Sequence, residues 1–198
     1  IIATIEGNIK NILTGERVAL NFLSHVSGVA TITNQFVGKV GKKCKICCTR
    51  KTIHNLRVIQ KYAVKLGGGI NHRFNLSDEI LIKDNHIAVH GSITKAIGQA
   101  RAVTPALTKI EVECDTLTQV KEAAEAGADV IMFDNMSAKM MKKGIEIING
   151  RSKTEASGGI RIDTIKEKAE SGVDVISVGR MTQSAPAVDI GLDVTITN

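Results

Sequence analysis

Six short apolar runs in this chain each end in charged residues or in a glycine-containing turn. In chain order, these ends are Thr49-Arg50-Lys51, Lys83-Asp84-Asn85, Glu113, Asp134-Asn135, Ser157-Gly158-Gly159 and Ser177-Val178-Gly179. If the runs are parallel strands of one barrel, their carboxyl ends meet at a single mouth. Cationic side chains bind carboxylates or phosphates there, and glycine turns bind phosphate through backbone N–H groups. The pattern therefore indicates a site for small anionic substrates.

A set of cations near a glycine run indicates carboxylate recognition. Gly67-Gly68-Gly69 permits a sharp turn or a close backbone approach shortly before His72 and Arg73. The guanidinium groups of Arg50 and Arg73 match carboxylates bidentately. A single arginine is most often solvated surface, and a glycine run alone is a plain loop. Two arginines together with a histidine and two strand-end lysines favour a carboxylate site.

Two carboxylates, Glu113 and Asp134, end neighbouring apolar runs. A carboxylate in this position is costly to bury unless it is paired or bound to a ligand. Together the two suit a ribose diol or a phosphate-bound Mg²⁺. The alternative is a structural salt bridge with Lys51 or Lys83.

The last two runs end in Ser157-Gly158-Gly159 and Ser177-Val178-Gly179. Barrel phosphate sites are typically built at the last strands, from backbone N–H groups and a helix N-terminus. A tight turn without a ligand is the alternative for either loop. The pairing of the two loops favours phosphate.

The remaining reactive side chains are a lysine and four cysteines. Lys83 is either a Schiff-base lysine or a simple cation for a substrate carboxylate. The spacing of Cys44 and Cys47 suits a metal or redox pair, but small thiols also pack well in a strand, and no second pair completes a zinc site. Structural cysteines are favoured. Reduced thiols in a chain without a secretory signal pattern predict a cytoplasmic protein.

The apolar runs are typical of strands that are buried on both faces. The expected strands are Lys45–Thr49, Glu79–Lys83, Lys109–Glu113, Asp129–Asp134, Lys153–Ser157 and Asp174–Gly179. The expected helices are Glu16–Gly28, Asn55–Lys65, Thr116–Ala126 after an Asp115 N-cap, and one from an Asp163 cap to Gly172. The core candidates of the first helix are Val18, Leu20, Phe22, Leu23 and Val26.

An internal repeat supports this alternation. Residues 124–131 match residues 169–176, and each copy reads as a helix end, a glycine stop and a buried strand. Alternating helices and strands imply a parallel sheet. The absence of a dinucleotide G-x-G-x-x-G motif favours a barrel over a doubly wound sheet. We therefore expect an α/β fold, an incomplete parallel (TIM-like) barrel over residues 41–198, preceded by a helical segment over residues 1–40.

Composition narrows the classes of function. The chain has 198 residues, of which 43% are hydrophobic and 23% charged, which excludes wholesale disorder. Its apolar runs are too short to span a bilayer. The net charge of +6 suits an anionic partner, but one Tyr and four Phe, none grouped with basic residues, provide no stacking platform for single-stranded nucleic acid. Small anions are the favoured ligands.

Several motifs carry a resemblance to a known family. They are Glu16–Leu23, Thr49-Arg50-Lys51-Thr52, the run from Lys61 through Gly67-Gly68-Gly69 to Arg73, Leu81-Ile82-Lys83-Asp84-Asn85-His86, Ile110–Glu113, Phe133-Asp134-Asn135, Glu155–Ile160 and Ile176–Gly179. They resemble quinolinate phosphoribosyltransferase, also called nicotinate-nucleotide pyrophosphorylase. The resemblance runs from about Gly7 to Leu192 and is most specific from Thr49 to His86.

The resemblance implies a fold, a reaction and an assembly. The fold is an incomplete barrel preceded by a small N-terminal α/β domain, which we expect this chain to lack. The reaction transfers phosphoribosyl from 5-phosphoribosyl 1-diphosphate to quinolinate, gives nicotinate mononucleotide, diphosphate and CO₂, and belongs to de novo NAD biosynthesis. Mg²⁺ is the cofactor. The family forms homodimers or larger homo-oligomers with a shared active site. Neither nucleic acid nor a membrane is expected as a partner.

The resemblance also implies residue roles. The residues expected to hold the quinolinate carboxylates are Thr49, Arg50, His72, Arg73 and Lys83, with Arg17 contributed by a partner subunit. Lys51, Glu113 and Asp134 would address the phosphoribosyl group, with Lys83, Glu113 and Asp134 as the catalytic set. Mg²⁺ would bind mainly through the substrate, with Glu113 and Asp134 as candidate ligands. The residues expected to cradle the 5-phosphate are Ala156, Ser157, Gly158, Ser177, Val178 and Gly179.

Two departures and three rival functions accompany this interpretation. Ile53-His54-Asn55 stands where the family usually has a Thr-Pro-Gly-like stretch, and Gln183 stands where many members have histidine. The first rival is a related, molybdenum-linked family member with another substrate, against which the four dicarboxylate-directed cations argue. The second is a Schiff-base aldolase built on Lys83. The third is a basic RNA-binding module, which the two mouth carboxylates oppose.

Overall fold

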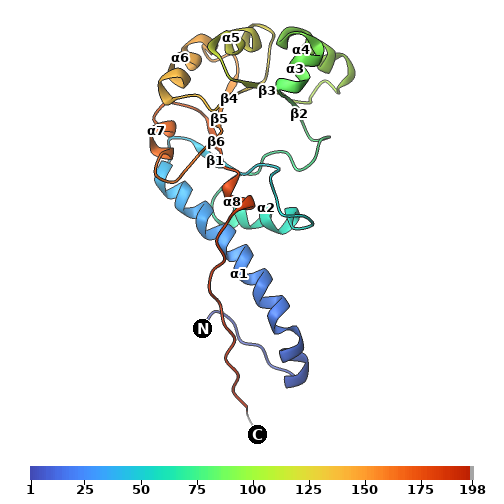
Figure 1. Ribbon diagram of the computed structural model, residues 1–198, viewed down its shortest axis with the longest axis vertical. Coiled ribbons are helices and arrows are strands. Elements are labelled where there is room, and N and C mark those ends of the chain that lie inside the picture. Colours follow the sequence, from blue (N-terminus) through green and yellow to red (C-terminus); the bar gives the residue numbers. More distant parts are fainter. Residues whose placement is uncertain (197–198) are drawn as a thin grey trace.

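The computed structural model describes residues 1–196 as one curved parallel sheet with helices around its outer side (Figure 1). The strands are β1 (Lys45–Cys47), β2 (Ile80–Ile82), β3 (Ile110–Cys114), β4 (Val130–Asp134), β5 (Lys153–Ser157) and β6 (Val175–Ser177). The helices are α1 (Ile9–Val40), α2 (Arg57–Leu66), α3 (Asp84–His90), α4 (Ile93–Val103), α5 (Leu117–Glu125), α6 (Ala138–Ile148), α7 (Ile165–Ala169) and α8 (Arg180–Gln183).

The strand order distinguishes a barrel from a doubly wound sheet. Strands β2 to β6 lie side by side in chain order, and β1 pairs with β6 at the far end. A doubly wound sheet reverses its order at a switch point, whereas a barrel keeps sequential order around a ring. Here β1 and β2 form the two edges of the sheet, so the ring is open between them (Figure 1). The expected incomplete parallel barrel is confirmed.

The strands match the expected positions, but most are shorter. The bounds of β5 are those expected, whereas β1 ends at Cys47 and β6 at Ser177, two residues earlier than expected. The reason at β1 is a local turn, in which the Thr49 hydroxyl accepts the Lys51 N–H at 3.0 Å. Helices α3, α4, α6 and α8 had no sequence-based expectation.

Two of the expected helix caps are wrong. The N-cap of α5 is Thr116 rather than Asp115, and its hydroxyl accepts the Gln119 N–H at 3.2 Å in a capping box. Asp163 does not cap α7, because that helix begins after Thr164 and ends at Ala169. Asp163 instead pairs with Arg161.

The internal repeat has a structural role at the amino ends of the strands. Asp129 accepts the backbone N–H of Ile110 in β3, and Asp174 accepts that of Thr154 in β5, both at 2.9 Å. Each aspartate thus connects the start of its own strand to the start of the neighbouring strand. The two aspartates lie at the edge of the sheet opposite to the mouth.

Helix α1 is longer than expected and is only partly covered. It continues past Gly28, where a Cβ atom would lie 2.0 Å from the Pro186 carbonyl oxygen, so glycine there is a packing requirement and not a stop. The second half of the helix buries Val29, Phe36 and Val40. The first half projects away from the sheet (Figure 1). The expected core positions Val18, Phe22 and Leu23 are wrong, since all three are exposed; Leu20 and Val26 are half-buried.

The triple glycine Gly67-Gly68-Gly69, which precedes His72 and Arg73, packs closely against α1. A Cβ at Gly67 would lie 2.4 Å from the Ala30 carbonyl oxygen, and one at Gly69 would lie 2.8 Å from Thr33 Cγ2. The expectation of a close backbone approach is therefore confirmed. Among residues 1–196, no helix combines the length and the apolar character that crossing a bilayer requires.

Candidate active site

The carboxyl ends of the strands bring the expected residues to one edge of the sheet. Asp134 of β4 is in register with Ser157 of β5, and Cys47 of β1 with Ser177 of β6. Lys83 directly follows β2, and Glu113 is the penultimate residue of the adjacent β3. Since all neighbouring strands are parallel, these side chains lie around the same mouth.

The segment with His72 and Arg73 is attached to the edge strand β1. The Ile70 N–H donates to the Ile46 carbonyl at 2.8 Å, and the Cys48 N–H donates to the Ile70 carbonyl at 3.1 Å. These bonds place the segment beside Arg50, which follows β1. Residues from distant parts of the chain thus meet here.

Arg50 and Arg73 form a cationic pair near the mouth, with the carboxylates of Glu79 and Glu111 in its neighbourhood. Burial and then the charge of Arg50 lower the pKa of Arg73, which shows that the two guanidinium groups repel each other. Arg73 donates to the Glu79 backbone carbonyl at 3.1 Å. Within residues 1–196, the buried Nε of Arg50 has no hydrogen-bond partner. Unpaired buried donors of this kind suit an anionic ligand.

Arg57 fixes the loop that carries Arg50, a role that the sequence analysis missed. Its guanidinium donates to Thr52 Oγ1, to the Arg50 carbonyl and to the Phe74 carbonyl at 3.1–3.3 Å. The unusual stretch that begins at Ile53 is also anchored, because the Ile53 N–H donates to the side chain of Gln60 at 3.0 Å. The departure from the usual loop sequence therefore still gives an ordered loop beside the cations.

Lys51 lies against the last strand-end loop. A Cβ at Gly179 would lie 3.4 Å from Lys51 Cδ and 3.7 Å from Thr49 Oγ1 and Gln183 Oε1. The Thr182 hydroxyl donates to the Lys51 carbonyl at 2.7 Å. Thr49, Lys51 and Gly179 are thus brought together as expected, and Gln183 is beside them.

The two mouth carboxylates differ in their partners. Glu113 forms an ion pair with Lys83, which is the structural alternative that the sequence left open. Asp134 accepts from the side chain of Asn135 at 2.6 Å. Both groups are oxygen donors of the kind that Mg²⁺ prefers. Lys83 is half-exposed and ion-paired, which is not the desolvated setting in which a lysine acts as a Schiff-base nucleophile.

The two expected phosphate loops are not equally available. Gly158 has φ +82°, and a Cβ there would lie 2.2 Å from Asn135 Oδ1, so only glycine fits. In the other loop, the Ser177 hydroxyl donates to Glu155 and the Val178 N–H donates to the Cys47 carbonyl. Ala156 is buried within the sheet. The accessible phosphate-directed groups are therefore those of Ser157-Gly158 and Gly179.

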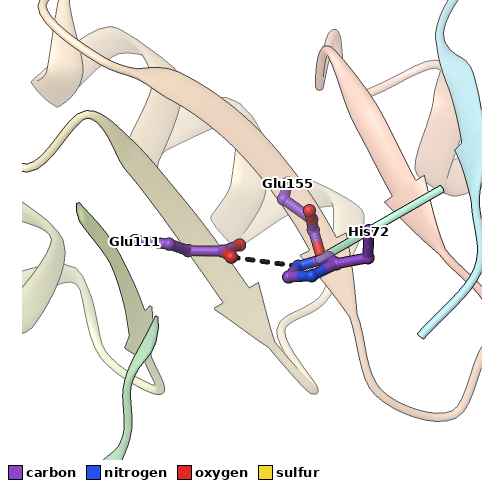
Figure 2. A group of neighbouring side chains, drawn as sticks. All are labelled: His72, Glu111 and Glu155. Atoms are coloured by element: carbon purple, nitrogen blue, oxygen red, sulfur yellow. Dashed lines mark ion pairs between the residues drawn. The ribbon is translucent and has the colours of Figure 1, made fainter. Parts of the chain in front are cut away.

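A buried acidic cluster lies beneath the cations and was missed by the sequence analysis. His72 Nε2 is 3.0 Å from Glu111 Oε2 and 3.8 Å from Glu155 Oε1 (Figure 2). His72 Nδ1 is 2.9 Å from Glu79 Oε1. Both Glu111 and Glu155 are buried. The available signal was strand periodicity, since Glu111 and Glu155 lie two residues before the mouth residues Glu113 and Ser157 on the same strands.

The charges in this cluster depend on one another. Burial alone would lower the pKa of His72, but its contacts with Glu111 and Glu79 raise it to about 10. Burial, and then the nearby Glu111, raise the pKa of Glu155 well above its usual range. His72 is therefore an imidazolium at neutral pH, and Glu155 is the carboxyl that most readily keeps a proton. The His72, Glu111 and Glu155 ligand atoms lie within 4.8 Å of one another, as a metal site would require, but the 3.0 Å contact is that of an ion pair.

Lys61 is a second buried cation that supports the site. Its Nζ donates to the His72 carbonyl at 2.7 Å and to Cys48 Sγ at 3.2 Å. It thereby connects α2 to both segments that carry the site cations. Cys47 and Cys48 are buried and all four cysteines are free, which fits the structural interpretation of the cysteines.

Arg17 is not among the residues brought together. It lies on the exposed first half of α1. A role in the site of this same chain has no support in the arrangement, so its expected contribution from a partner subunit stays a prediction.

Two cavities lie away from the mouth. One of about 220 Å³ is lined by β2, α3 and α4, and one of about 450 Å³ is lined by the amino-end residues of β3 to β6, including Asp129 and Asp174. Neither cavity is lined by an expected site residue. The candidate site is the carboxyl edge of the sheet, away from both of these cavities.

Comparisons with known proteins match this arrangement. The family description "Quinolinate phosphoribosyl transferase, C-terminal domain" matches residues 29–193, and "Quinolinate phosphoribosyl transferase, N-terminal domain" matches residues 1–27. The probable nicotinate-nucleotide pyrophosphorylase [carboxylating] of Bacillus subtilis is 46% identical over 100% of this chain and 69% of its own length. The chain belongs to the quinolinate phosphoribosyltransferase family. The family's N-terminal domain, which the sequence analysis expected to be missing, is represented in this sequence by a short piece over residues 1–27.

Solved structures of quinolinate phosphoribosyltransferase family members show the same fold. The crystal structure of NadC from Streptococcus pyogenes has a TM-score of 0.89 and 50% identity, and covers 92% of this chain and 65% of that one. The nicotinate-nucleotide pyrophosphorylase from Ehrlichia chaffeensis has a TM-score of 0.86 and 48% identity, with 89% and 65% covered. The chain thus spans about two thirds of the length of these relatives.

Proposed function

We propose that the protein carrying this chain is a decarboxylating quinolinate phosphoribosyltransferase of NAD biosynthesis. Quinolinate and 5-phosphoribosyl 1-diphosphate would react to nicotinate mononucleotide, diphosphate and CO₂. The observation that supports this most directly is the unpaired, buried Nε of Arg50 beside Arg73, at the same mouth as Lys83, Glu113 and Asp134. Arginine and lysine side chains gathered at one mouth suit a dianionic aromatic substrate and a polyanionic co-substrate.

The roles of the residues divide between the two substrates. Arg50, Arg73 and Lys83 would bind the quinolinate carboxylates, with Thr49 and His72 nearby and Arg17 from a partner subunit of a homo-oligomer. Lys51, Glu113 and Asp134 would face the phosphoribosyl group. Ser157, Gly158 and Gly179 would receive the 5-phosphate through N–H and hydroxyl groups, because the polar groups of Ser177 and Val178 are already bonded internally.

The chemistry follows from the charges on the substrates. Departure of diphosphate makes ribose C1 cationic, so the chain's task is to orient the ring nitrogen of quinolinate toward C1 and to neutralise the leaving group. No covalent nucleophile is needed. The ring nitrogen then carries positive charge, which stabilises the electron pair left on C2 when CO₂ departs. C2 finally takes a proton from the solvent.

Mg²⁺ fits this proposal through the diphosphate. The Asp134 carboxylate and the Glu113 carboxylate, which Lys83 now neutralises, are the candidate protein ligands. When bound, Mg²⁺ would neutralise diphosphate charge. Four free cysteines support a reducing compartment, which we propose to be the cytoplasm.

Calorimetry of Arg73→Ala tests the site assignment. Because Arg73 lies near Arg50 and is expected to bind a substrate carboxylate, the variant should lose quinolinate binding and largely keep phosphoribosyl diphosphate binding. Lys121→Ala, on the exposed outer helix α5, is the matched control and should bind both ligands normally. An unchanged quinolinate affinity in Arg73→Ala would overturn the role of this cation pair.

A further inference from the structure

The two site arginines lie beyond the backbone pairing that joins their segments. Within residues 1–196, that pairing ends with the hydrogen bond from the Cys48 N–H to the Ile70 carbonyl. Arg50 follows this point on one segment, and Arg73 follows it on the other. Burial and then the charge of Arg50 lower the pKa of Arg73, so the two like charges oppose a close approach. A fixed spacing between them therefore needs a further connection.

Arg57, the first residue of α2, supplies that connection. Each of its three guanidinium nitrogens donates to a different acceptor. Nη2 donates to the Arg50 carbonyl at 3.3 Å, Nε to Thr52 Oγ1 at 3.1 Å, and Nη1 to the Phe74 carbonyl at 3.2 Å. Phe74 directly follows Arg73, so Arg57 binds the backbone beside both site arginines. Because all three acceptors are uncharged oxygens, the planar fork of the guanidinium makes the connection, and not an ion pair.

Other side chains of α2 hold the helix in place independently of Arg57. Lys61 donates to the His72 carbonyl at 2.7 Å, and Gln60 donates to the Thr182 carbonyl at 2.7 Å. Both donors are buried, whereas Arg57 is partly exposed. A conservative change of Arg57 therefore leaves the attachment of α2 intact and alters only the connection between the two arginine segments.

We propose that Arg57 is a positioning residue that holds Arg50 and Arg73 at the spacing that the two carboxylates of quinolinate require. This rests on the proposed function, in which the two arginines bind these carboxylates. Both arginines are partly exposed, so a ligand can reach them. An arginine binds a carboxylate strongly only in a narrow bidentate geometry, so a changed spacing would weaken the binding of a dicarboxylate.

The proposal predicts a ligand-selective effect of Arg57→Lys. Lysine keeps the positive charge, but its single ammonium nitrogen cannot occupy the three donor positions of the fork. Binding of phosphoribosyl diphosphate should be little affected, because Lys51 is held separately by the hydroxyls of Thr49 and Thr182. A merely structural role would weaken the binding of both ligands or of neither.

The experiment is calorimetry of quinolinate and of phosphoribosyl diphosphate with the purified protein, Arg57→Lys and Arg101→Lys. Arg101 is the matched control, since it also donates to three acceptors, Thr108, Gly127 and Asp129, at the opposite edge of the sheet. Thermal melting shows whether each variant is folded. We expect Arg57→Lys to bind quinolinate about tenfold more weakly than Arg101→Lys, the loss of about one charge-assisted hydrogen bond, with equal phosphoribosyl diphosphate affinity.

A second variant serves if Arg57→Lys does not fold. Thr52→Val removes one of the three acceptors of Arg57 and should weaken quinolinate binding by about threefold, again without an effect on phosphoribosyl diphosphate.

The outcomes separate the two proposals. Quinolinate affinity in the folded variant that equals that of Arg101→Lys, or an equal loss for both ligands, would overturn the role of Arg57 alone. A failure of the unsubstituted protein to bind quinolinate would overturn the proposed function, and this inference with it.

Discussion

At the residue scale, the site depends on a buried histidine whose positive charge is stabilised by neighbouring acids, first Glu111 and then Glu79. Burial alone would lower the pKa of His72, and without His72 the buried Glu111 carboxylate would lack its cationic partner. The charged forms of His72 and Glu111 therefore stabilise each other. A cation near the base of the substrate site is thereby maintained at neutral pH.

This dependence predicts a decline in stability at alkaline pH. The pKa of His72 rises from about 6.5 in the unfolded chain to about 10 in the fold, so its contribution is complete below pH 6.5 and is lost as the pH rises through about 10. Urea unfolding of the protein should show stability falling between pH 8 and pH 10. In His72→Gln the slope over this window should be shallower.

Comparing the unsubstituted protein with His72→Gln controls for the other groups that titrate at alkaline pH. Cys44, Cys47 and Cys114 have raised pKa values in the fold and add the same alkaline decline to both proteins. Identical slopes in the two proteins would show that His72 is not held as an imidazolium in the fold.

The sequence predicted the residues at the mouth better than those below it. Arg50, Lys83 and Asp134 interrupt or end apolar runs, and that contrast is visible without a structure. Glu111 alternates with apolar residues inside a strand and reads as part of a buried run. Its role depends on His72, which reaches it only through the pairing of Ile70 with β1. No local pattern encodes that contact.

At the element scale, glycine was informative in one place and misleading in another. Gly67 and Gly69 permit the approach of their segment to α1, as expected. The expected first helix ended at Gly28, although this glycine lies inside α1 and makes room for the backbone at Pro186. A sequence shows that a glycine is present but not which neighbour requires it.

A substitution at Gly67 tests whether this approach matters. In Gly67→Ala, the new methyl group would lie 2.4 Å from the Ala30 carbonyl oxygen, so α1 and the site segment would have to separate. We expect a loss of about 1–3 kcal/mol in the free energy of unfolding, measured in urea, because backbone overpacking is not easily relieved.

Gly98→Ala is the matched control for that substitution. Gly98 lies in α4 and has open space around its Cβ position, so alanine should stabilise the helix by up to about 1 kcal/mol. If Gly67→Ala were as stable as Gly98→Ala, the packing of the triple glycine on α1 would not be a constraint on the site.

At the scale of the whole molecule, the chain has two parts with different roles: the open barrel carries the candidate site, and the first half of α1 projects away from it. The sheet supplies the strand ends that carry the proposed carboxylate and phosphate groups. The first half of α1 carries Arg17 together with exposed apolar side chains such as Phe22 and Leu23. The sequence predicted the order of the strands, because each buried strand is a local pattern, but it missed α3, α4, α6 and α8 and did not predict which faces of α1 would be covered.

The central claim is that this single mouth joins quinolinate to phosphoribosyl diphosphate. The most direct measurement is product formation by the purified protein with quinolinate, 5-phosphoribosyl 1-diphosphate and Mg²⁺. We predict that nicotinate mononucleotide, diphosphate and CO₂ appear in equal amounts, and that none appears when either organic substrate is withheld. Absence of nicotinate mononucleotide from the complete mixture, or its formation without phosphoribosyl diphosphate, would contradict the account.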